Sequence, residues 1–91
     1  MHPPYMEWTY KAPGVKLFGV LTKERAAKRL AKRLRQLRQA RGLSQESLAI
    51  DAGLGRAYYW RVEQGAINLT LETLVRLSNA LKVEISDLFL K

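Results

Sequence analysis

Three glycines at nearly even intervals, Gly42, Gly53 and Gly65, constrain the fold of this chain more than any other feature. Glycine readily takes the left-handed backbone conformation in which helices end. Each of the three follows a stretch in which apolar residues recur at helical spacing. The pattern therefore predicts an all-α fold made of short helices.

Residues that favour the start of a helix alternate with these helix-ending glycines, and together they predict five helices. The expected elements are a helix over residues 23 to 41 with Thr22 as its N-cap, a short helix from Ser44 to Gly53, a helix over residues 56 to 64, a helix that begins after Thr70, and a last helical turn opened by Ser86-Asp87. We expect the five to pack as one compact domain over residues 22 to 91.

Residues 1 to 21 differ from the rest of the chain and are expected to form an N-terminal appendage. They carry all three prolines and both methionines. Pro13-Gly14 suits the centre of a turn, and the flanking residues favour extended structure, so a short hairpin or an arm is one interpretation. A disordered tail is the alternative, because chain termini fray by default.

Length and composition exclude several classes of protein. A chain of 91 residues without cysteine cannot be a disulfide scaffold or hold a cysteine zinc site. No apolar run approaches the roughly 20 residues of a membrane span, so we expect a cytoplasmic protein with no membrane partner. The one histidine, His2, lies at the start, and no paired acids or phosphate-binding glycine loop occur. We therefore expect no enzyme, no cofactor and no metal site.

The net charge of +8 is concentrated in one segment. Residues 23 to 41 hold nine basic side chains and one acidic one, and the rest of the chain is balanced. Such a run is either a solvated helix face or a patch that faces phosphates. A membrane-surface helix is disfavoured, because its apolar face consists of alanine and leucine and is needed for the core.

Two short helices around a glycine turn form a helix-turn-helix unit, whose second helix can enter the major groove of DNA. Here the residues also resemble a known family. The motifs are Leu34-Arg35-Gln36-Leu37-Arg38, Gly42-Leu43-Ser44-Gln45-Glu46-Ser47-Leu48-Ala49, and Gly53, Arg56, Glu63, Gly65, Asn68 and Leu71-Glu72-Thr73-Leu74 at matching intervals. Over roughly residues 30 to 90 the chain resembles the Cro/Xre, lambda-repressor-like helix-turn-helix family, and Gly53 to Tyr58 is particularly similar to restriction-modification controller proteins.

The resemblance implies a function. The chain is expected to be a nucleoid-associated, sequence-specific transcriptional regulator that binds double-stranded DNA. A homodimer is expected to bind an inverted-repeat operator through residues 56 to 64. One alternative keeps the fold and changes the partner: a DNA-binding antitoxin would neutralise a toxin protein and repress its own operon.

Helical geometry predicts which side chains would read bases. At 100° per residue, one face of about 140° contains Arg56, Ala57, Trp60, Arg61 and Gln64, opposite the apolar residues. The two arginines can each pair with guanine, and the Ala57 methyl can contact a thymine methyl.

Two aromatic residues complete the predicted base-contacting set. Resemblance to the controller proteins implies that Tyr58 reaches DNA, and packing on the preceding helix is the alternative. Trp60 departs from the small polar residue usual in the family. It is a wedge between bases, a cover for the arginine stems, or a partner of the N-terminal segment.

Other site residues follow from the resemblance. Gln45, at a helix N-terminus, is expected to bind a phosphate as its family counterpart does, and Gln64 and Asn68 resemble further phosphate contacts. The family pattern also implies a structural ion pair between Arg38 and Glu63.

The dimer surface is expected at the C-terminal end. Ile85, Leu88 and Phe89 are apolar candidates for it, and the alternative is that they close the core of the monomer. Ile50 and the appendage of residues 1 to 21 are further candidates. Near this end, Lys82 replaces a glycine usual in the family, which is expected to weaken a helix cap.

Overall fold

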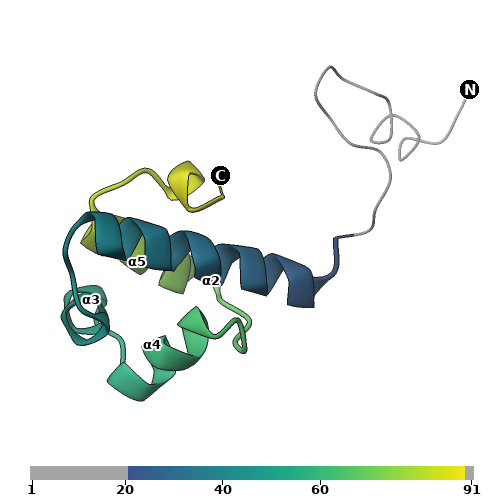
Figure 1. Ribbon diagram of the computed structural model, residues 1–91, viewed down its shortest axis with the longest axis horizontal. Coiled ribbons are helices and arrows are strands. Elements are labelled where there is room, and N and C mark those ends of the chain that lie inside the picture. Colours follow the sequence, from purple (N-terminus) through teal and green to yellow (C-terminus); the bar gives the residue numbers. More distant parts are fainter. Residues whose placement is uncertain (1–20, 90–91) are drawn as a thin grey trace, which may run out of the picture.

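The computed structural model describes residues 21–89, which form four α-helices and one 3₁₀ helix (Figure 1). The elements are α2 at Lys23–Ala40, α3 at Gln45–Ala52, α4 at Arg56–Glu63, α5 at Leu71–Leu81 and the 3₁₀ helix η1 at Ile85–Phe89. The all-α prediction is confirmed for residues 21–89. Apart from Leu21, the predicted appendage lies outside the described residues, and so does its proposed hairpin or arm.

The helix boundaries lie where the capping residues predict them. Ser44 Oγ accepts from the Ser47 amide at 3.0 Å, and Thr70 Oγ1 accepts from the Thr73 amide at 3.1 Å. Thr22 caps α2 in the same way. At the other ends, the three spaced glycines all have φ close to +70°. Each predicted α-helix boundary is therefore confirmed to within one residue or two.

The predicted fifth helix is not an α-helix. Residues Ile85–Phe89 form a single 3₁₀ segment of five residues. Its start is held locally, because Asp87 Oδ2 accepts from the Glu84 amide at 3.0 Å. A segment this short closes few i to i−4 hydrogen bonds, and the tighter 3₁₀ turn places residues three apart on the same face. The count is thus four α-helices and a 3₁₀ turn within the described part of the chain.

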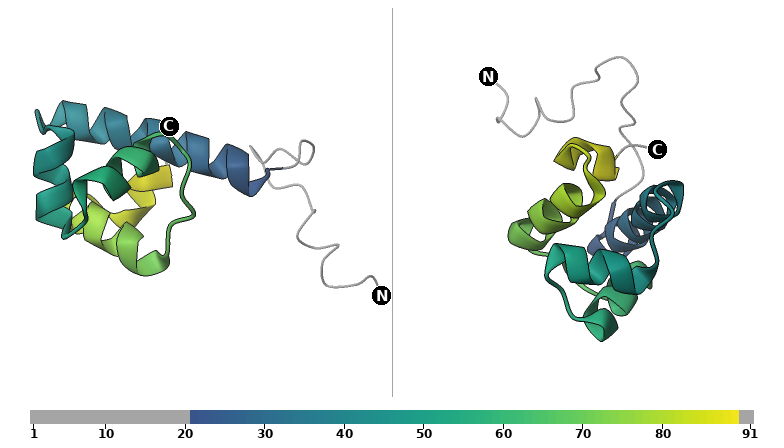
Figure 2. Two further views of the ribbon diagram at one scale, coloured as in Figure 1. Left: turned by 90° about the horizontal axis from the view of Figure 1, so that it is seen from below. Right: turned by 90° about the vertical axis from the view of Figure 1, so that its left-hand side faces the viewer.

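The helices enclose one apolar core. Helix α2 is the longest element, and in Figure 1 α3 and α4 lie below it and η1 lies above it. The left view of Figure 2 shows that all the other elements pack along one side of α2. The core is made of fully or nearly fully buried residues from every element, namely Leu34, Leu48, Ala49, Ala52, Tyr59, Val62, Leu77, Leu81 and Leu88. Among residues 21–89, no helix has the length and apolar character needed to cross a membrane.

The basic run on α2 is partly structural. Three of its arginines each donate to a carbonyl at the C-terminal end of another helix: Arg33 Nε to Asp87 O at 2.7 Å, Arg35 Nη1 to Glu63 O at 2.6 Å, and Arg41 Nη1 to Leu81 O at 3.0 Å. Helix C-termini carry unsatisfied carbonyls and partial negative charge, so these cations stabilise them. The charge run is therefore neither wholly a solvated face nor wholly a phosphate-binding patch.

The end of α5 carries backbone strain that a single substitution should relieve. Lys82 ends the helix at φ 59°, and it is the one non-glycine residue among the described ones with positive φ. The left-handed conformation costs an L-residue about 1 to 2 kcal/mol, whereas glycine avoids this cost but loses more chain entropy on folding. We expect Lys82→Gly to raise the free energy of unfolding by about 0.5 to 1 kcal/mol, measured by urea denaturation. Lys82→Ala is the control. If it raised the free energy of unfolding as much as Lys82→Gly does, the explanation by backbone strain would be contradicted.

Candidate nucleic-acid interface

The helices α3 and α4 form a rigid pair around a three-residue connection. Gly53 takes the left-handed conformation at φ 71°, and the Leu54 amide donates to Ala49 O at 2.8 Å, which closes the turn. Behind the pair, Leu48 and Tyr59 are fully buried in the core. The opposite face of α4 is consequently fixed in orientation and directed outward.

The outer face of α4 gathers most of the residues predicted to contact bases. Arg56, Ala57, Trp60 and Arg61 are exposed, and together with Gln45 from α3 they line one shallow hollow. The side chains come from two helices separated only by the tight turn. The structure thus brings four of the five predicted base-contacting residues together.

Tyr58 lies apart from this group. Its side chain is half-buried and packs against the hydrophobic core, and it does not line the hollow. This corresponds to the packing alternative. A contact between Tyr58 and DNA stays a prediction that nothing in the structure tests.

Arg56 has one weak partner. Its Nη1 lies 3.4 Å from Glu46 Oε2, and the two side chains are 77% and 59% exposed. Ion pairs between such exposed groups contribute little to stability. The guanidinium can leave Glu46 for a stronger acceptor at small cost.

A buried carboxylate fixes the inner side of α4. Glu63 is fully buried, and Arg38 binds it with both ends of its guanidinium, at 2.6 Å from Nε to Oε2 and 3.1 Å from Nη2 to Oε1. Gln45 Nε2 donates to Oε1 at 3.0 Å, and the Tyr59 hydroxyl donates to Oε2. The ion pair that the family pattern implies is present, within a larger cluster of four side chains.

The cluster shifts the pKa values of its members. Burial by itself raises the pKa of Glu63, but the hydrogen bonds from Arg38, Tyr59 and Gln45 outweigh it, and the net pKa lies below the ordinary value. The hydrogen bond to Glu63 raises the pKa of Arg38. Burial, followed by the hydrogen bond to Glu63, raises the pKa of Tyr59. The glutamate is thus held as a carboxylate and the tyrosine as a neutral donor.

Sequence reasoning missed two members of this cluster. Helical spacing places Tyr59 among the inward-facing residues of α4 but does not indicate its hydrogen bond, and the family resemblance indicates only a phosphate contact for Gln45. The sequence does contain a signal for Tyr59. It lies four residues before Glu63, and side chains four residues apart on a helix are neighbours. Gln45 and Glu63 are 18 residues apart in the sequence, and only the folded structure brings them together.

The three predicted phosphate contacts occupy different places. Gln45 lies in the hollow, and although one amide N–H is committed to Glu63, a primary amide has a second N–H. Gln64 is exposed at the C-cap of α4. Asn68 is exposed in the loop before α5, where it borders a different pocket. The outward positions suit phosphate binding, which stays a prediction.

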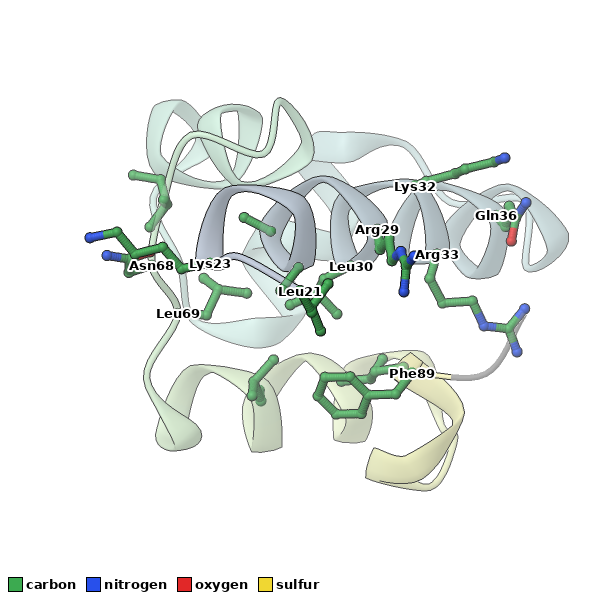
Figure 3. A pocket seen from close by; sticks show the side chains of 15 residues that line it. Leu21, Lys23, Arg29, Leu30, Lys32, Arg33, Gln36, Asn68, Leu69 and Phe89 are labelled. Carbon is green, nitrogen blue, oxygen red and sulfur yellow. The ribbon is translucent and has the colours of Figure 1, made fainter. Parts of the chain in front are cut away.

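That second pocket lies between the N-terminal half of α2, the loop before α5, and η1 (Figure 3). It has a volume of about 740 Å³. Its floor is apolar, with Leu30 and Leu69 among the lining residues, and Leu21 and Phe89 border it with more than half of their surface exposed. Basic side chains of α2 surround it, including Lys23 and Lys32.

The expected dimer surface is only partly available. Leu88 is fully buried in the core of the monomer, so the prediction that it forms a dimer contact is wrong. The cause is the 3₁₀ turn, in which Ile85 and Leu88 share the inward face. Ile85 is half-buried, and Phe89 is 63% exposed. Ile50, Leu71 and Val75 are further exposed apolar residues, and the last two were not predicted.

Comparisons with known proteins agree with this geometry. A family model described as a helix-turn-helix domain matches residues 29–88. Control protein C.MunI from a Mycoplasma species is 39% identical over 62 residues, which cover 67% of this chain and 84% of that protein. The crystal structure of the restriction-modification controller protein C.AhdI from Aeromonas hydrophila is 44% identical with a TM-score of 0.69, over 70% of this chain and 97% of that chain.

A third similar protein has been solved in complex with DNA. The restriction-modification controller protein C.Esp1396I, solved as a tetramer in complex with its natural 35 base-pair operator, is 27% identical with a TM-score of 0.65, over 69% of this chain and 83% of that chain. The resemblance seen in the sequence motifs is confirmed by these matches. The chain belongs to the helix-turn-helix domain family and is homologous to the restriction-modification controller proteins.

Proposed function

We propose that this protein is a transcriptional regulator that binds double-stranded DNA in a sequence-specific manner, with α4 as its recognition helix. The observation that carries the proposal is the exposed outer face of α4, where Arg56, Trp60 and Arg61 line one hollow while the inner face is locked into the core. A helix held in this way can enter the major groove as a rigid body.

The chemistry of this face suits base reading. Each arginine presents a fork of N–H donors that matches the O6 and N7 acceptors of guanine. The Glu46 carboxylate holds the Arg56 guanidinium only weakly, so the cost of transferring it to a base is small.

Phosphate contacts would set the position of the protein on the duplex. Gln45, Gln64 and Asn68 are the candidates from the predicted set. The exposed basic residues of the N-terminal half of α2, including Lys28, Arg29 and Lys32, add sequence-independent attraction.

We further propose a homodimer on an inverted-repeat operator. The solved relative that carries DNA is an oligomer on its operator, and this chain has exposed apolar side chains outside the DNA-facing helix, among them Leu71 and Phe89. Two-fold symmetry of the protein then matches two half-sites about one helical turn apart. The relatives described above are controller proteins, and none of the three is described as an antitoxin, so the antitoxin alternative gains no support.

The test is selection of bound duplexes from a random library at about 150 mM salt, where nonspecific attraction to the basic surface is weakened. Wild type is expected to yield an inverted repeat. Arg56→Ala and Arg61→Ala should each lower the discrimination between bases at one position per half-site by about 1 to 3 kcal/mol, because each variant removes one guanine contact. Lys32→Ala is the matched control, since it removes a positive charge of α2 and should lower affinity without changing the motif. Failure to obtain any motif would overturn the proposal.

A further inference from the structure

Trp60 is the most unusual group on the outer face of α4. Its side chain is 52% exposed, although tryptophan has the largest apolar surface of any residue. It belongs to the hollow and not to the core. Tryptophan is enriched at interfaces, where a partner covers its apolar body.

The hollow has an apolar part and a polar rim. Trp60 and Ala57 supply the apolar part, and Arg56, Arg61 and Gln45 surround it with hydrogen-bond donors and two positive charges. A ligand that fits must therefore present a small apolar group within a polar, negatively charged surface. In the major groove, the C5-methyl group of thymine is the apolar group that a base edge offers.

We propose that the hollow between Ala57 and Trp60 binds the C5-methyl group of a thymine in each half-site. The proposal rests on the proposed function and specifies which base feature this face recognises. Trp60 then contributes to sequence specificity by an apolar contact, in addition to the hydrogen bonds of the two arginines.

The spacing places this thymine close to a guanine. Arg56 and Trp60 are four residues apart on α4, so their Cβ atoms are separated by about 5 to 6 Å. Successive bases on one strand are about 3.4 Å apart. The methyl group read by Trp60 is therefore expected on a base pair near the guanine read by Arg56.

In the free protein the charged end of Arg56 has a partner on α3. The Arg56 guanidinium points to Glu46 on α3, with Nη1 at 3.4 Å from Oε2. Trp60 is 52% exposed and lines the hollow together with Ala57, where a methyl group can reach it.

The experiment removes single methyl groups from the operator. Each thymine of the selected motif is replaced in turn by deoxyuridine, which lacks only the C5-methyl, and Kd is measured by fluorescence anisotropy with the full chain. We expect one position per half-site at which wild type loses about four-fold in affinity, the value that corresponds to burial of one methyl group. Trp60→Ala should bind the thymine duplex more weakly than wild type and show a smaller further loss on the deoxyuridine duplex, because only Ala57 then contacts the methyl group.

The controls separate this contact from other effects. Trp60→Phe keeps an aromatic ring and should keep part of the sensitivity, and deoxyuridine placed outside the inverted repeat should have no effect. Since Trp60 is exposed, far-UV circular dichroism of Trp60→Ala should match wild type. Equal sensitivity to deoxyuridine in wild type and Trp60→Ala, or no sensitive thymine in wild type, would overturn the inference while leaving the proposed function intact. A library that yields no motif would overturn both.

Discussion

Replacing Glu63 with alanine is expected to lower the free energy of unfolding by about 3 to 5 kcal/mol. The substitution leaves the Arg38 guanidinium, 12% exposed, without its carboxylate partner. Gln45 and Tyr59 lose the acceptor of their hydrogen bonds in the same step. Because the total free energy of unfolding of a folded protein is only about 5 to 15 kcal/mol, the variant should be largely or partly unfolded at physiological temperature.

Urea denaturation followed by far-UV circular dichroism measures this loss. Tyr59→Phe is the matched control, because it removes one hydrogen bond to Glu63 and keeps the ion pair, and we expect it to cost about 1 to 3 kcal/mol. DNA binding of Glu63→Ala should fall in proportion to its helicity. A variant with full helicity and no DNA binding would instead place Glu63 in contact with DNA and contradict its structural role.

The pH dependence of stability provides a second measurement of the same ion pair. The pKa of Glu63 is lower in the folded protein than its ordinary value of 4.5. The unfolded chain therefore takes up the proton first, and the stabilisation is complete above the ordinary pKa and is lost as the pH falls through the lowered one. Wild type should lose stability in this acidic range, and Glu63→Gln should lose less over the same range.

The helix boundaries could be predicted because their signals are local. A serine or threonine that accepts from the amide three residues later, as Ser44 does, is recognisable from sequence spacing. The same is true of a glycine that ends a helix, as Gly53 does. The last element was mistaken because its 3₁₀ geometry depends on packing against α2 and α5, and no residue type in Ile85–Phe89 specifies it.

The outer face of α4 could be predicted because it follows from helical periodicity once the inner face is known. The exposure of Arg56, Trp60 and Arg61 agrees with that derivation. Contacts between segments far apart in the chain could not be predicted in this way. Arg33 and Arg35 are alike in sequence context to the other basic residues of α2, yet the fold directs them to carbonyls of η1 and α4.

Gly65 makes a close contact that sequence spacing does not reveal. Its φ of +72° was expected for a helix end, but the adjacent backbone of α2 was not. A Cβ built at this position would lie 3.0 Å from Lys28 Cγ and 3.2 Å from Lys28 Cα. The first atom belongs to a flexible side chain and can move, whereas the second is part of the α2 backbone.

Gly65→Ala is therefore expected to lower the free energy of unfolding by roughly 2 to 5 kcal/mol, the sum of left-handed strain and overpacking against α2. Gly42→Ala is the matched control, because Gly42 has a similar φ of +69° and nothing within 4 Å of the added Cβ. It should lose only about 1 to 2 kcal/mol, from backbone strain alone. Urea denaturation of the two variants thus isolates the contact between α2 and the end of α4. Equal losses would show that α2 moves aside freely, and the orientation of the recognition helix would then not depend on this contact.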